Sequence, residues 1–249
     1  MPSKSTDQPS APLLLMYHHI APPPAGARIR GMYVSPRQFD WQLGWLKKRG
    51  YEFVTFADLL NVTRAPGRQV LITLDDGYLN NYSHAFPILQ KYQARAVIYP
   101  ILNDLGKVGV SWPGATEQTP ADMMSKAQLQ EMAAAGIEFG SHLLEHTRLT
   151  EMPAAEQVEQ LSRSREELAQ LQNTPVLSIA YPYGAYDDAV LARTKAAGYQ
   201  FGVTTEPGIN RPGTDPLQLN RFTAKGCKLY HPLKFARMIG AAERQLEQL

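Results

Sequence analysis

Short apolar runs alternate with amphipathic segments along most of the chain. Runs rich in Val, Ile, Leu and aromatic residues predict strands, whereas apolar residues that repeat every three or four positions predict helices. The predicted strands are 13–17, 51–54, 70–74, 94–99, 137–140, 176–180, 201–204 and 219–222, and the predicted helices are 36–50, 56–61, 83–92, 126–135, 154–172, 187–197 and a last one from about 232 onward. Strands separated by helices favour an α/β fold with a parallel sheet or barrel and helices outside it.

Two stretches break this alternation. Residues 1–12 are rich in Ser, Pro and Gln, and residues 103–120 are rich in Gly, Thr and Pro. We expect a flexible segment at 1–12, one domain over 13–249, and an excursion over the surface at 103–120.

Composition and charge narrow the class of protein. A chain of 249 residues with 44% hydrophobic residues can bury one large core, so we expect a single domain. The formal net charge is only +2 and no long basic run occurs, which argues against nucleic acid as a partner. No apolar run is long enough for a signal-peptide core or a transmembrane segment, so we expect a cytoplasmic protein.

The cysteine content limits the kind of metal site. Cys227 is the sole cysteine, which excludes an intramolecular disulfide and a thiolate-rich zinc site. Any metal ion must therefore be held by histidine and carboxylate side chains.

Polar clusters follow four of the predicted strands. They are His18-His19, Asp75-Asp76, His142 with His146, and Tyr181-Pro182-Tyr183-Gly184. In parallel α/β folds the chemistry takes place at the carboxyl ends of the strands, where such clusters meet. An isolated Asp-Asp-Gly is more often a turn and a helix cap, but this convergence favours a functional site.

Two histidines and one carboxylate make a suitable site for a divalent metal. His142 and His146 lie four residues apart, so a helical turn would point both imidazoles the same way. Asp76 can complete the set and leave coordination positions open for water and substrate. Asp75 would then stay near the metal without binding it and take a proton from the attacking water. Zn²⁺ suits these ligands best, although Ni²⁺, Co²⁺ or Mn²⁺ could also bind.

The motifs Thr73-Leu74-Asp75-Asp76-Gly77, Ser141-His142 with His146, and Tyr181-Pro182-Tyr183-Gly184 occur in this order. In this combination the chain resembles the polysaccharide deacetylases of the fourth carbohydrate-esterase family over about residues 13–222. The resemblance implies a distorted, incomplete (β/α) barrel of about seven strands, similar to a TIM barrel. It also implies a metal-dependent hydrolase that removes acetyl groups from N-acetylated sugars. By resemblance, the metal ligands are Asp76, His142 and His146, the base is Asp75, and the Tyr183 N–H helps to form the oxyanion hole.

The N-terminal strand points to a candidate general acid. Leu15-Met16-Tyr17-His18 resembles the start of the subgroup that contains poly-β-1,6-N-acetylglucosamine deacetylases, which makes His18 the candidate. The alternative for His18 is a buried strand histidine with a structural hydrogen bond. His231 is a rival acid, because Leu229-Tyr230-His231 resembles a late motif of other members. We favour His18 because His231 opens a predicted terminal helix.

The chain departs from the family pattern at three positions. Leu74 replaces the usual phenylalanine, and Leu143 stands where Ser or Thr is common. Ala180 stands where many members carry an arginine that orients the base, and a base without that cation would have a higher pKa and a looser position. Arg221 could supply the missing cation from another part of the chain; the alternative is a surface arginine paired with a carboxylate.

The predicted function is removal of N-acetyl groups from a glycan or glycolipid that contains N-acetylhexosamine. Trp112 and Tyr183 are candidates for stacking on the sugar, and Pro182 can fix the turn that presents the Tyr183 N–H. The same catalytic groups would also fit an O-acetyl esterase or a non-sugar amidase. A carbohydrate-binding pseudoenzyme is a further alternative, suggested by Ala180.

Overall fold

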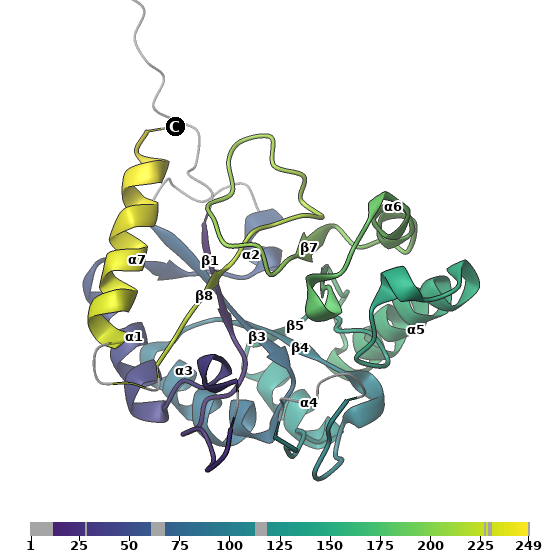
Figure 1. Cartoon of the computed structure of the whole chain (residues 1–249), viewed down its shortest axis with the longest axis horizontal. Coiled ribbons are helices and arrows are strands. Elements are labelled where there is room, and N and C mark those ends of the chain that lie inside the picture. The colour runs from purple at the N-terminus through teal and green to yellow at the C-terminus, as the bar shows by residue number, and fades with distance from the viewer. Residues whose placement is uncertain are drawn as a thin grey trace, which may run out of the picture.

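The computed structural model shows parallel strands that curve into a central sheet with helices around it (Figure 1). It describes residues 12–27, 29–60, 68–112, 119–226, 228 and 231–248. Cys227 and all of the predicted flexible segment except Pro12 lie outside the described residues. The strands are β1 Leu13–Tyr17, β2 Glu52–Phe53, β3 Gln69–Asp76, β4 Val97–Pro100, β5 Glu138–Phe139, β6 Ser178–Ala180, β7 Phe201–Val203 and β8 Phe222–Thr223. The α-helices are α1 Pro36–Lys48, α2 Phe56–Leu60, α3 Phe86–Tyr92, α4 Lys126–Ala134, α5 Ala154–Gln172, α6 Asp188–Ala196 and α7 His231–Leu246.

The strands form an incomplete barrel. One parallel sheet has the order β5-β4-β3-β1-β8, with β2 also paired to β3, and β6 pairs with β7 in a second sheet. Isolated parallel bridges join the two sheets: Ser141 pairs with Ile179, and Val203 pairs with Leu219 shortly before β8. The predicted α/β barrel-like fold is confirmed, with eight strands in the described part of the chain rather than about seven.

Apolar side chains pack on both faces of the strands. The cluster inside the barrel has members on β1, β3, β4, β6 and β7 and in the segment after β2. They are Leu14, Val54, Phe56, Leu71, Val97, Tyr99, Ala180 and Val203. The alternate residues of β1, Leu13, Leu15 and Tyr17, belong to the larger cluster that includes the helices. Tyr17, for example, meets Phe39 of α1 edge-on at 5.1 Å between ring centroids. Because β1 and β3 are buried on both faces, the side chains at their carboxyl ends start from a rigid base.

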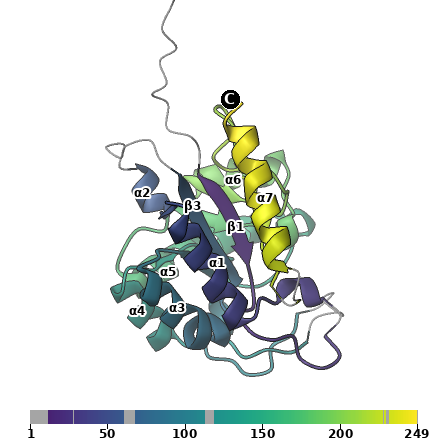
Figure 2. The same ribbon diagram turned by 90° about the vertical axis from the view of Figure 1, so that its left-hand side faces the viewer.

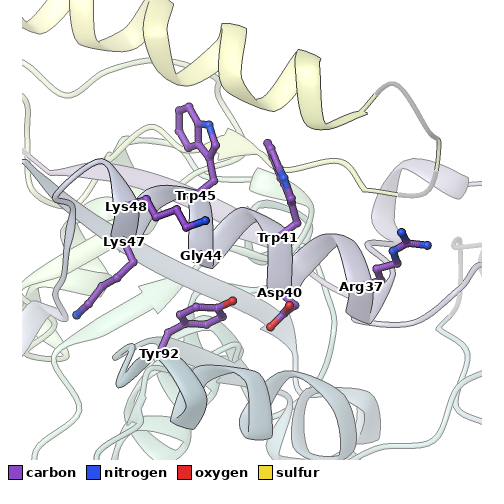
Figure 3. A pocket seen from close by; sticks show the side chains of 8 residues that line it. All are labelled: Arg37, Asp40, Trp41, Gly44, Trp45, Lys47, Lys48 and Tyr92. Atoms are coloured by element: carbon purple, nitrogen blue, oxygen red, sulfur yellow. The ribbon is translucent and has the colours of Figure 1, made fainter.

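Helix α1 begins as the sequence predicts and packs beside α7. Ser35 caps it, because its Oγ accepts a hydrogen bond from the Gln38 N–H at 3.3 Å, and Pro36 occupies the first position. Phe235 of α7 meets the rings of Trp41 and Trp45, and Figure 2 shows the two helices side by side. The outer side of α1 carries a pocket (Figure 3), which is lined by Arg37, Asp40, Trp41, Gly44, Trp45, Lys47, Lys48 and Tyr92. No residue of the strand ends contributes to it.

Several predicted boundaries are wrong. Strand β3 runs to Asp76, so both carboxylates lie within the strand; Asp75 pairs with Tyr99, and Asp76 pairs with Pro100. The helix predicted over 83–92 is a π-helical turn at Asn81–Ala85 followed by α3. Six of the predicted strands are shorter than expected, because only the part of each apolar run that pairs with a neighbouring strand forms a ladder. They are the strands now observed as β2, β4, β5, β6, β7 and β8.

Candidate active site

The carboxyl ends of four strands bring the predicted site residues together. His18 follows β1, Asp75 and Asp76 end β3, His142 and His146 follow β5, and Tyr181 to Gly184 follow β6. The segment from His142 to His146 is an irregular loop and not a helical turn, with Leu143 in the left-handed region at φ 69°. The loop still places the two imidazoles 5.1 Å apart between ring centroids.

Asp76, His142 and His146 form a compact buried cluster. The Oδ1 atom of Asp76 lies 3.3 Å from Nε2 of His142 and 3.6 Å from Nε2 of His146. The Oδ2 atom of Asp76 is buried and has no hydrogen-bond partner among the described residues. Candidate ligand atoms of all three residues lie within 4.8 Å of one another, and the donor set suits a divalent cation.

The electrostatics of the cluster favour an ionised carboxylate. Burial acts to raise the pKa of Asp76, but the imidazoles of His142 and His146 outweigh it and hold that pKa well below its usual range. Burial lowers the pKa of His146 to about 4. His142 is held by a 2.7 Å contact from its Nδ1 to the Ala180 carbonyl oxygen, which accepts the Nδ1 proton and leaves Nε2 to face Asp76.

Gly77 is required for the turn that follows the carboxylates. Its φ is +78°, and a Cβ atom there would lie 2.8 Å from Cα of Pro100. We expect Gly77→Ala to lower the free energy of unfolding by about 1–3 kcal/mol, measured by urea denaturation. Gly106→Ala is the matched control, because Gly106 has a similar φ of +81° but open space around it. Equal losses in the two variants would show that the contact with Pro100 has no effect.

Asp75 forms a different set of contacts from its neighbour. Its two oxygens accept hydrogen bonds of 2.7 Å from Nη1 and Nη2 of Arg221. Arg221 is fully buried and also donates to the Thr204 carbonyl at 2.8 Å and to the Thr73 hydroxyl at 2.9 Å. The alternative interpretation of Arg221 as a surface arginine is therefore wrong. Burial raises the pKa of Asp75, but the ion pair with Arg221 outweighs it, and the pKa of Asp75 is lowered.

The two candidate acids lie in different surroundings. Nε2 of His18 is 4.0 Å from Oδ2 of Asp75, and the His18 side chain is partly exposed at 17%. His231 begins α7, where its Nδ1 accepts a hydrogen bond from the Lys228 N–H, and it lines an outer pocket with Lys234 and Phe235. Leu229 and Tyr230, which completed the rival motif, lie outside the described residues.

Aromatic side chains border the cluster. Trp112 and Tyr183 each lie 4.4 Å from the His146 ring between centroids, and the Arg148 guanidinium lies 4.1 Å over the Tyr183 ring. Tyr183 adopts the left-handed conformation at φ 58° directly after Pro182. The predicted surface excursion is wrong at its centre, because Trp112 is buried and its indole N–H donates to Asp104 at 2.7 Å.

Sequence reasoning missed a second aromatic group beside the site. The His19 ring is stacked between Tyr33 at 4.3 Å and Tyr78 at 3.6 Å, and Nδ1 of His19 lies 3.0 Å from the Asn80 amide nitrogen. The His18-His19 pair was the available signal, but only tertiary packing shows that His19 is buried and His18 borders Asp75.

The comparison with protein families identifies the chain. The family model for polysaccharide deacetylase matches residues 63–202. The chain belongs to this family. The polysaccharide deacetylase family, the barrel-like fold and the class of enzyme predicted from the sequence, a carbohydrate N-deacetylase, are thereby confirmed. No helix in the described ranges is both long and apolar enough to span a bilayer.

Individual relatives agree with the family assignment. The chain is 31% identical to the Bacillus subtilis protein YxkH over 207 residues, covering 82% of this chain and 67% of that protein. It is 29% identical over 218 residues to poly-β-1,6-N-acetyl-D-glucosamine N-deacetylase of Staphylococcus aureus, covering 83% and 72%. Two solved structures match the fold. The Streptococcus pyogenes deacetylase PplD in complex with acetate has a TM-score of 0.78 at 29% identity and covers 93% of this chain and 99% of that one. IcaB from Ammonifex degensii has a TM-score of 0.73 at 27% identity, covering 93% and 98%.

Proposed function

We propose that the chain removes N-acetyl groups from a glycan or glycolipid that contains N-acetylhexosamine, with Asp76, His142 and His146 as metal ligands. The observation that carries this proposal is the separation of two adjacent carboxylates: Asp76 faces the two imidazoles, whereas Asp75 faces Arg221 and His18. A purely structural pair of carboxylates would not need such different partners. The name of the S. aureus relative supports the choice of an N-acetylated hexosamine polymer.

The donor set and the orphaned oxygen of Asp76 fit a divalent cation, and Zn²⁺ suits two imidazoles and one carboxylate best. When bound, such an ion polarises the acetamide carbonyl and makes water more acidic. The residues of the chain then perform the proton transfers. Asp75, oriented by the Arg221 fork, accepts a proton from the attacking water.

The remaining residues stabilise the oxyanion, protonate the leaving nitrogen and contact the sugar. The Tyr183 N–H donates to the developing oxyanion, and Pro182 fixes the turn that presents it. His18 lies next to Asp75 and is partly exposed, so it can give a proton to the departing nitrogen. Tyr183 lies beside His146 and is only partly buried, so one sugar face can pack against it. The products are acetate and a free amine.

The first experiment measures metal content and acetate release on N-acetylglucosamine oligomers. We expect about one metal ion per chain in the wild type and none in His142→Ala after dialysis, because a two-ligand site binds far more weakly. His84→Ala is the matched control, because the exposed His84 contacts the Ile20 carbonyl and lies outside the cluster. Metal retained by His142→Ala would contradict the ligand assignment.

A panel of substrates separates the alternative functions. Acetate released only from O-acetylated sugars would indicate an esterase. Metal binding without turnover on any acetylated sugar would indicate a carbohydrate-binding protein. The contact of Arg221 with Asp75 speaks against this last alternative, because it supplies a cation for the base although position 180 is alanine. The cytoplasmic location stays a prediction from the sequence.

A further inference from the structure

The two histidines of the proposed metal site are supported in different ways. Nδ1 of His142 contacts the Ala180 carbonyl oxygen at 2.7 Å. Nδ1 of His146 is buried and has no hydrogen-bond partner in the described part of the chain. Histidines that bind metals almost always donate their second ring N–H to a carbonyl, a carboxylate or water, which fixes the orientation of the ring. Among the described residues, the contacts that hold the His146 ring are made by neighbouring side chains.

Aromatic packing supplies these contacts. The ring of His146 lies between Trp112 and Tyr183, each 4.4 Å away between centroids and tilted by 41° and 51°. Each such pair contributes about 0.5–1.5 kcal/mol beyond the burial of its area. Both rings pack against the imidazole and restrict its rotation without a hydrogen bond to its nitrogen atoms.

Trp112 is itself fixed in place. Its Nε1–H donates to Oδ2 of Asp104 at 2.7 Å, and Oδ1 of Asp104 accepts from Lys107 at 3.0 Å. The turn that carries Asp104 is joined to the loop that carries His146, because the N–H groups of Leu102 and Asn103 donate to the carbonyls of Leu143 and Leu144. These backbone bonds therefore fix the position of Asp104, and of the indole bound to it, relative to His146.

We propose that Trp112, anchored by Asp104, is a positioning residue that holds the His146 imidazole ready for the metal in place of a second-nitrogen hydrogen bond. This inference rests on the proposed function, because it requires His146 to be a metal ligand. It gives Trp112 a role that does not depend on contact with the sugar. It also predicts that the buried Asp104 affects metal binding although it is not a ligand.

The test measures metal affinity directly, by competition of the purified protein with a chelator for Zn²⁺, and records the visible absorption spectrum of the Co²⁺ form. We expect Trp112→Leu to weaken metal binding about 10- to 100-fold, the range for loss of a group that orients a ligand, and to alter the Co²⁺ spectrum. Trp112→Phe, which keeps a ring but loses the anchor, should weaken it less. Asp104→Ala removes the anchor but keeps the indole, so it should weaken metal binding by no more than Trp112→Phe does.

A matched control removes an indole elsewhere. Trp41→Leu changes the pocket on the outer side of α1 (Figure 3), and it should leave the metal affinity and the Co²⁺ spectrum as in the wild type. Melting temperatures measured without metal show whether each variant is folded. If Trp112→Leu does not fold, Trp112→Phe provides the test.

The outcomes separate this inference from the proposed function. If His146→Ala keeps the wild-type metal affinity, the proposed ligand set fails. If His146→Ala loses the metal but Trp112→Leu and Trp112→Phe bind it as tightly as the wild type, only the positioning role is overturned. A rise in KM with unchanged metal affinity would make Trp112 a substrate contact alone, which also overturns it.

Discussion

Replacing Asp75 by asparagine is expected to lower kcat by about 10²- to 10⁴-fold, the range that a general base contributes. The amide cannot accept the proton of the attacking water, yet it has nearly the shape of the carboxylate. The cluster of Asp76, His142 and His146 does not include Asp75, so metal content should stay as in the wild type. Acetate release and metal content measured on the same preparation check this expectation.

The same substitution also affects stability, because Arg221 would remain buried without its counter-charge. A buried charge without its partner costs about 3–5 kcal/mol. A double variant, Asp75→Leu with Arg221→Leu, removes both charges and should regain stability while it remains inactive, which separates catalysis from folding. Asp40→Asn removes a carboxylate that pairs with Lys91 on the outer side of α1 and serves as the control. An Asp75→Asn variant with wild-type kcat would refute the assignment of the base.

Replacing Arg221 by alanine should lower turnover far more than it lowers metal content. The guanidinium fixes both oxygens of Asp75, so its loss leaves the base poorly oriented and raises the pKa of Asp75. The free energy of unfolding should fall by about 3–5 kcal/mol. Arg163→Ala is the matched control, since Arg163 is 54% exposed and pairs with two glutamates of α5; its effect should stay within about 0.5 kcal/mol. Unchanged turnover in Arg221→Ala would remove Arg221 from the mechanism.

The pH dependence of stability follows from the direction of the Asp75 pKa shift. A carboxyl group whose pKa is lowered on folding stabilises the folded state above its unfolded pKa of about 3.9, and this contribution is lost as the pH falls through the folded pKa. Arg221→Ala lacks the contribution. The difference in stability between wild type and variant should therefore be largest near neutral pH and shrink below about pH 4, as measured by denaturant unfolding.

The sequence predicted the fold where local signals decide it. The cap at Ser35 and the proline after it define the start of α1, and the predicted helix over 154–172 has the bounds of α5. Strand lengths were less predictable, because an apolar run shows burial but not whether a neighbour lies alongside. Val176 is fully buried in the core, for example, yet it lies before the start of β6.

For the site as well, local patterns in the sequence point to some residues, whereas only the tertiary structure brings in the others. Asp75, Asp76, His142 and His146 lie in short motifs, so the residue types alone drew attention to them. Arg221 lies 146 positions from Asp75, and no local pattern shows that the two side chains meet. Trp112 sits in a segment whose Gly and Pro content predicts a surface loop, and only its bond to the buried Asp104 shows that the indole turns inward.

The pairing of β1 with β8 has a consequence for how the protein is made. The family model matches residues 63–202, but His18 follows β1 and Arg221 precedes β8, outside that segment at its two ends. During synthesis on a ribosome, Asp75 is made well before Arg221. The nascent chain therefore carries the carboxylate without its guanidinium, and the barrel stays open on that side until β8 can pair with β1. The ion pair between Asp75 and Arg221 is thus among the last contacts that the growing chain can form.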